Sequence, residues 1–128
     1  MEHRTVSAFA GLDDLRPLRV WDGVVAWAVE GERTTFALIE LEAGREVPEH
    51  RHDNEQLGVL IAGSMRFRIG DEVRDVVPGD TWNIPGGVPH QVDVGPDGAL
   101  VAECFTPTRS DWAEKERLEG HPAPAWPS

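Results

Sequence analysis

Residues 44–63, GREVPEHRHDNEQLGVLIAG, are the stretch from which the fold and the candidate site follow. His50 and His52 stand two positions apart, and on an extended chain such side chains point to the same face. Gln56 follows four residues after His52, where a bend in the strand would bring its amide oxygen beside the imidazoles. Glu55 would point to the other face unless a bulge intervenes. The pattern predicts a metal site with Gln56 as the preferred oxygen ligand and Glu55 as the alternative.

A third imidazole is available from residues 79–90, GDTWNIPGGVPH, which end in His90. The glycines and prolines of this stretch predict turns, so His90 can reach the same centre from a different strand. Three imidazoles and one oxygen suit Mn, Fe, Ni, Zn or Cu, and the ligand types do not choose among them. We therefore expect a divalent transition metal of open identity, held by His50, His52, Gln56 and His90.

The two stretches resemble the two motifs of the small single-domain cupins. The first motif is Gly, five residues, His, one residue, His, three or four residues, Glu, six residues, Gly, and its places are filled by Gly44, His50, His52, Gln56 and Gly63. Gln replaces only the Glu. The second motif is met by Gly79, Pro85, Gly87 and His90, with Val94 where Asn would stand. The resemblance implies an all-β fold, a double-stranded β-helix or jelly-roll barrel.

The rest of the chain independently predicts short strands joined by tight turns. Asp22-Gly23 suits a two-residue hairpin loop ahead of a strand over residues 24–30. Further turns are expected at residues 31–33, 63–64, 70–71, 78–80 and 95–98. About ten strands at this spacing are typical of a double-sheet barrel.

The chain is interpreted as a single domain spanning residues 1–128, with a barrel core at about residues 18–107. The extensions, residues 1–17 and 108–128, are expected to cover sheet edges or a dimer partner. Ser110 is an acceptable N-cap for a short C-terminal helix, which the prolines after residue 120 would end. The cupin resemblance implies a homodimer. His3 and His121 are interpreted as surface residues.

Composition restricts the class of partner. A net charge of −11 disfavours nucleic acid and anionic membrane surfaces. Cys104 is the single cysteine, so the chain forms no internal disulfide, and we interpret its side chain as a small hydrophobe. We find neither a signal-peptide pattern nor an apolar run of membrane-spanning length, and the default expectation is a cytoplasmic protein.

The last predicted strand carries a second group of candidates. Glu103 and Phe105 lie two positions apart and share a face, and Arg109 follows shortly after. If that face is the barrel interior, Glu103 can give or take a proton, Phe105 can form a pocket wall, and Arg109 can bind a substrate carboxylate. If it is not, they are a rim acid, a core residue and a surface residue. Trp82 is a candidate for the pocket lining, whereas Trp21, Trp27 and Trp112 are expected in the core or at an edge.

Residues 52–56 and 103–112 are also similar to the small cupins of pectin and alginate breakdown. This resemblance implies conversion of 4,5-unsaturated uronates to linear keto sugars, with Glu103 where that group usually has Asp. Four neutral ligands would leave the ion its full +2 charge, which favours Lewis-acid chemistry on a small anionic substrate. The alternatives are a cupin dioxygenase that uses Fe at the same site and a sugar- or metal-binding module without turnover.

Overall fold

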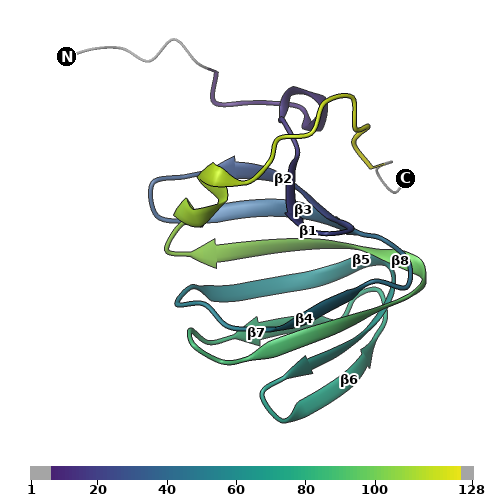
Figure 1. Ribbon diagram of the computed structural model, residues 1–128. Helices are drawn as coiled ribbons and strands as arrows, with labels where there is room; N and C mark the ends of the chain where they lie inside the picture. The colour runs from purple at the N-terminus through teal and green to yellow at the C-terminus, as the bar shows by residue number, and fades with distance from the viewer. Residues whose placement is uncertain (1–6, 125–128) are drawn as a thin grey trace.

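The computed structural model describes residues 7–124, which form one sheet of eight strands (Figure 1). The strands are β1 (Leu18–Trp21), β2 (Val24–Glu30), β3 (Thr35–Leu41), β4 (Glu46–His50), β5 (Glu55–Ile69), β6 (Glu72–Val76), β7 (Thr81–Ile84) and β8 (His90–Thr106). Two 3-10 helices, η1 (Leu12–Asp14) and η2 (Ser110–Glu114), flank them. Within residues 7–124, neither helix has the length and apolar character to cross a bilayer. The all-β prediction is confirmed.

The long strands β5 and β8 organise the sheet. Its order is β1-β2-β3-β8-β5-β6, with β4 paired to β8 and β7 paired to β5. The second half of β8 pairs with β3, and its first residues pair with β4. The first half of β5 pairs with β7 and its second half with β6. Each long strand therefore serves both halves of the barrel and bends between them, as Figure 1 shows.

Two of the predicted turns are bends within long strands. Residues 63–64 and 95–98 do not end strands, because β5 and β8 continue through them, and the count is eight strands rather than about ten. The pairing of the two strands shifts register between Gly63 and Met65, which marks an irregularity of the bulge type. Gly63 has φ +85° and Gly98 has φ +77°. A glycine with positive φ serves a bulge as well as a turn, and the sequence pattern alone does not separate the two.

The C-terminal helix prediction is only partly right. The segment forms one short 3-10 helix, and its N-cap residue is Arg109 instead of Ser110. The backbone N–H of Arg109 donates to the Thr35 hydroxyl (2.9 Å), and Trp112 is buried, so contacts with the barrel fix this segment more than helix propensity does. Tertiary contacts often override weak local preferences in this way.

The following tail returns to the edge strand β1. Leu18 forms a bridge with Arg117, and the N–H of Leu118 donates to the carbonyl of Pro17 (2.9 Å). The tail thus covers a sheet edge, as predicted. His121 lies at the surface with 34% of its side chain exposed, and its ring lies 5.6 Å from that of Trp27. His3 lies outside the described residues.

The inward side chains of the sheet form the core and leave a pocket at one side. Ala26, Ala37, Leu60 and Ile84 are almost fully buried. The rings of Phe67 and Trp82 pack edge to face with centroids 5.2 Å apart. Within residues 7–124 the buried polar residues are Thr35 on β3 and a group on β5 and β8, Gln56, His90 and Glu103, and this group marks the candidate site.

The bulge at Gly63 generates a stability prediction. An added Cβ at Gly63 would lie 2.0 Å from the carbonyl oxygen of Gly98, whereas at Gly44 (φ +73°) it would meet nothing within 4 Å. Gly44→Ala should cost about 1–2 kcal/mol from backbone strain alone. Gly63→Ala should cost about 3 kcal/mol or more, because the strands must also separate. Urea unfolding of both variants checks this, and equal losses would contradict it.

Candidate metal centre

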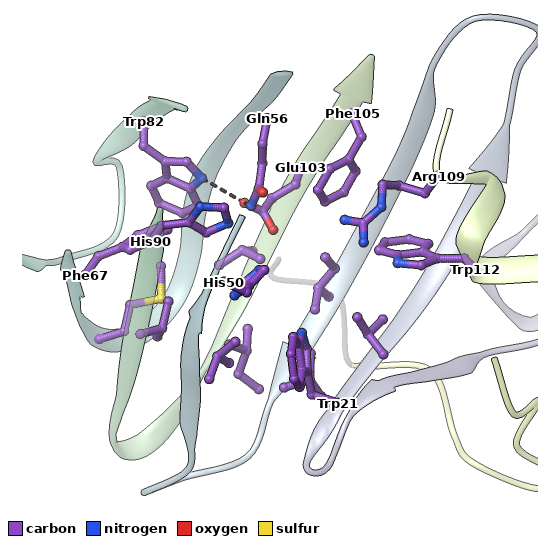
Figure 2. A pocket seen from close by; sticks show the side chains of 18 residues that line it. Trp21, His50, Gln56, Phe67, Trp82, His90, Glu103, Phe105, Arg109 and Trp112 are labelled. Carbon is purple, nitrogen blue, oxygen red and sulfur yellow. Dashed lines mark hydrogen bonds between the residues drawn. The ribbon is translucent and has the colours of Figure 1, made fainter. Parts of the chain in front are cut away.

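Three histidines meet at one point, as the sequence predicted. His50 ends β4, His52 lies in the following loop, and His90 begins β8. His50 and His90 are paired across β4 and β8, which explains why residues 40 positions apart come together. One ligating nitrogen from each of the three lies within 4.8 Å of the others. The ring centroids of His50 and His90 are 4.3 Å apart, and Figure 2 shows both rings at the pocket.

The Nδ1 atoms of all three rings face backbone carbonyls two residues away. His50 pairs with Pro48 O (2.9 Å), His52 with Asn54 O (3.1 Å), and His90 with Val88 O (2.9 Å). A carbonyl only accepts, so each Nδ1 carries the ring proton and each Nε2 keeps a free lone pair. This arrangement fixes tautomer and ring orientation in metal-binding histidines.

The surroundings keep the imidazoles neutral. Burial lowers the pKa of His90 to about 4, and the neighbouring imidazoles and Arg109 contribute to the lowering. Burial also lowers the pKa of His50 and of His52, with a further contribution from the charge of Arg109. At neutral pH the three rings are therefore neutral, with Nε2 free of a proton, as a metal-binding histidine must be.

Gln56 supplies the fourth acceptor. Its side chain is buried on the inner face of β5, while Glu55 is exposed, so Glu55 as the alternative ligand is wrong. The strand is regular at this point, and period 2 separates the two residues. Gln56 Oε1 lies 2.9 Å from His52 Nε2, and the amide nitrogen donates to Glu103.

These contacts leave an excess of acceptors that a cation would satisfy. Both ring nitrogens of His52 face oxygens, and a neutral imidazole has a single N–H to offer. His90 Nε2 is buried without a hydrogen-bond partner among the described residues. Unpaired buried acceptors are unfavourable. Three nitrogens and one amide oxygen are a suitable donor set for a divalent transition metal, so the residues fit such an ion.

Glu103 lies directly behind Gln56. It is on the inner face of β8, is 7% exposed, and accepts hydrogen bonds from Gln56 and from Trp82 Nε1 (2.8 Å). Figure 2 shows its carboxylate next to the Gln56 amide, with Trp82 on the other side. Burial raises the pKa of Glu103, while the two hydrogen bonds and the charge of Arg109 oppose that rise.

Arg109 also faces the pocket and is not a surface residue. Its side chain is 11% exposed and its Cζ lies 4.9 Å from the Phe105 ring centroid and 4.8 Å from that of Trp112. Asp111 accepts from Nε (3.1 Å) and Nη2 (3.0 Å). The guanidinium is thus held between two aromatic rings, with its free edge toward the cavity. Glu103, Phe105 and Arg109 line the same pocket as His50, His90 and Gln56.

Sequence reasoning missed two residues at this pocket. Trp21, expected in the core or at an edge, is 36% exposed at the pocket mouth, with its ring 5.2 Å from that of His50. Trp112 is buried as expected, but it also forms pocket wall beneath Arg109. Trp21 ends the short strand β1 and Trp112 lies in a 3-10 helix, and neither element is long enough to show a periodic pattern that separates a pocket tryptophan from a core one. Trp27 is in the core, and Trp82 lines the pocket, as predicted.

The fold and this centre define a β-barrel with a histidine-rich interior site that suits a divalent metal. The cupin domain family (Cupin_2) matches residues 37–102, more than half of the chain. The chain therefore belongs to the cupin family, as the two motifs implied. No curated protein is matched by the chain.

Solved structures agree on the fold. An RmlC-like cupin from Shewanella frigidimarina has a TM-score of 0.75 at 19% identity, over 83% of this chain and 96% of that one. KdgF from Halomonas sp. has a TM-score of 0.74 at 21% identity, over 83% and 98%. A variant of the oxalate decarboxylase of Bacillus subtilis has a TM-score of 0.71 at 26% identity, over 91% of this chain and 34% of that one. The chain thus spans about a third of the decarboxylase, for which Mn(II) centres are described.

The low pKa of His90 predicts how the stability of the metal-free protein depends on pH. Unfolded His90 has a pKa near 6.5 and the folded residue about 4, so between these values the unfolded chain binds more protons. Lowering the pH from 6.5 to 4 should therefore reduce the free energy of unfolding by up to about 3 kcal/mol through His90 alone. The His90→Gln variant lacks this contribution, so its stability should fall less over the same range. Chemical unfolding across this range, on both proteins, measures the difference. Parallel curves would refute the assignment.

Proposed function

We propose that this protein is a metal-dependent enzyme that opens and isomerises the ring of a small, sugar-derived carboxylate, of the 4,5-unsaturated uronate class. One observation carries the proposal: the buried acid Glu103 and the cation Arg109 line the same pocket as His50, His90 and Gln56 of the candidate metal centre. The pocket is lined mainly by apolar side chains, and the few polar groups named above converge in it, which is typical of a small-molecule site. The similarity of residues 52–56 and 103–112 to the cupins of pectin and alginate breakdown supports the substrate class.

The metal would be held by Nε2 of His50, His52 and His90 and by Oε1 of Gln56. A divalent ion bound there supplies Lewis-acid polarisation of a substrate oxygen, and the four neutral ligands leave its charge undiminished. Mn, Fe, Ni and Zn all suit this donor set.

Arg109 would bind the substrate carboxylate. A guanidinium pairs with a carboxylate through parallel N–H groups, and its fixed planar shape sets the orientation of the bound group. Phe105 and Trp112 already hold Arg109 in place, and Asp111 occupies Nε and Nη2, while Nη1 has no hydrogen bond to Asp111. The substrate therefore meets an ordered partner, which lowers the entropy cost of binding.

Glu103 would move the proton. Ring opening takes a proton from the anomeric hydroxyl and breaks the bond between the anomeric carbon and the ring oxygen, which gives an enol. Protonation at C4 then gives the keto form, so no atom is gained or lost overall. Burial raises the pKa of the Glu103 carboxyl, which favours its taking up and returning a proton during the reaction.

A second candidate is redox or decarboxylation chemistry on a small carboxylate with Mn or Fe. The identity of 26–28% with the oxalate decarboxylase, over 83–91% of this chain, favours keeping it. This second candidate includes the dioxygenase alternative. A dioxygenase consumes oxygen and a decarboxylase releases carbon dioxide, whereas an isomerase does neither. The binding-module alternative is weakened because Glu103 and Arg109 face the pocket. The homodimer and the cytoplasmic location remain predictions.

The test is incubation of metal-loaded protein with 4,5-unsaturated galacturonate while the enol absorbance is followed. We expect its loss at a rate far above that in buffer, abolished by stripping the metal and restored by adding it back. Arg109→Lys should raise KM about tenfold or more, because a lysine cannot reproduce the planar fork.

Arg66→Lys is the matched control, since Arg66 is exposed on the outer face of β5 and pairs with Asp75 there. It should leave KM unchanged. Unchanged absorbance with stoichiometric metal present would reject this activity, and oxygen uptake or carbon dioxide release in place of isomerisation would favour the second candidate.

A further inference from the structure

The Gln56 amide can sit in two orientations of nearly the same shape, and only one presents oxygen to the histidines. In the structure Oε1 lies beside His52 Nε2 and the amide nitrogen donates to Glu103. Without a metal, free imidazole lone pairs favour the opposite orientation, because an N–H would then face them. Something other than the histidines therefore selects the oxygen-inward orientation.

The carboxylate of Glu103 is that selecting group. It has no donor of its own when ionised, so it requires the nitrogen of Gln56 and repels the amide oxygen. The same oxygen atom, Glu103 Oε2, also accepts from Trp82 Nε1 at 2.8 Å. Two donors converging on one buried oxygen fix the carboxylate as well as the amide.

A glycine in the sheet leaves room for the hydrogen bond between Trp82 and Glu103. Gly58 on β5 is the register partner of Trp82 on β7 and of Glu103 on β8. An added Cβ at Gly58 would lie 2.4 Å from Trp82 Nε1. The indole therefore crosses the backbone at Gly58 to reach Glu103, and any side chain at position 58 would block that path.

Charge leads to the same residue. The cupin motif has Glu at the place of Gln56, so the direct ligands of this centre are all neutral. Glu103 is the one acidic residue among the described residues that line the pocket, and it stands one hydrogen bond away from the ligand position. A buried cation is stabilised by a nearby carboxylate even without direct contact.

We propose that Glu103 is a positioning residue of the metal centre: with Trp82 it holds the Gln56 amide oxygen toward the histidines, and it supplies the negative charge that Gln56 lacks. This inference rests on the metal centre of the proposed function. Besides proton transfer, Glu103 then has a second role, which acts through Gln56 on the metal and can be measured without any substrate.

The experiment is Co²⁺ binding by chelator competition, with the visible Co²⁺ spectrum as the report on coordination. Loss of partners behind a ligand typically weakens metal affinity by about 10–100-fold. We expect Glu103→Leu to fall in that range, Glu103→Gln to weaken binding about tenfold because charge alone is lost, and Trp82→Phe about threefold or more. The leucine and phenylalanine variants should also change the spectrum.

The most decisive variant exchanges the side chains of positions 56 and 103. The double variant Gln56→Glu with Glu103→Gln returns one carboxylate to the pair, and the amide introduced at position 103 can still accept from Trp82 while donating to position 56. It should restore Co²⁺ affinity to within about threefold of the native protein. Glu72→Gln, at an exposed position of β6, makes the same change in net charge as Glu103→Gln and should alter nothing.

The outcomes separate the two proposals. Native protein that binds no Co²⁺ would overturn the metal centre and this inference together. Native protein that binds Co²⁺, with Glu103→Gln and Trp82→Phe binding equally well, would overturn the positioning role and leave the centre intact. A cooperative thermal unfolding transition of each metal-free variant checks that the variant is folded. If Glu103→Leu does not fold, the exchange variant still decides the test.

Discussion

The structure depends on one unfavourable arrangement: three imidazole lone pairs and an amide oxygen face each other inside the barrel. All four are hydrogen-bond acceptors, and too few donors are present to pair with them. His90 Nε2 has no partner within the described residues, and His52 is between two oxygens. Protonation would relieve the conflict, but burial and Arg109 lower the pKa values of the histidines. A divalent cation relieves it with the residues already in place.

The barrel imposes this arrangement through pairing at its centre. β8 carries His90 at its start and Glu103 near its end, and it pairs with β4, which carries His50, and with β5, which carries Gln56. The bends at Gly63 and Gly98 let the two long strands serve both halves of the sheet. The carboxylate, the ligands and the pocket wall are therefore set by strand register more than by loops, which makes the geometry rigid.

The sequence predicted most of the site because the site follows short-range rules. Period 2 separated Gln56 from Glu55 and placed Glu103 and Phe105 on one face, and turn chemistry located most strand ends. It did not predict that Gly63 marks a bulge, since the deciding contact is with Gly98 on another strand. The link from Trp82 across Gly58 to Glu103 was hidden for the same reason: it exists only once β7, β5 and β8 are in register.

Anomalous diffraction from crystals of the metal-loaded protein tests the central claim most directly. The account predicts one strong peak about 2.0–2.2 Å from Nε2 of His50, His52 and His90 and from Oε1 of Gln56, with Glu103 behind the amide and outside the coordination shell. A peak held by other residues, a Gln56 nitrogen turned toward the histidines, or no peak after growth in metal-supplemented medium would contradict it.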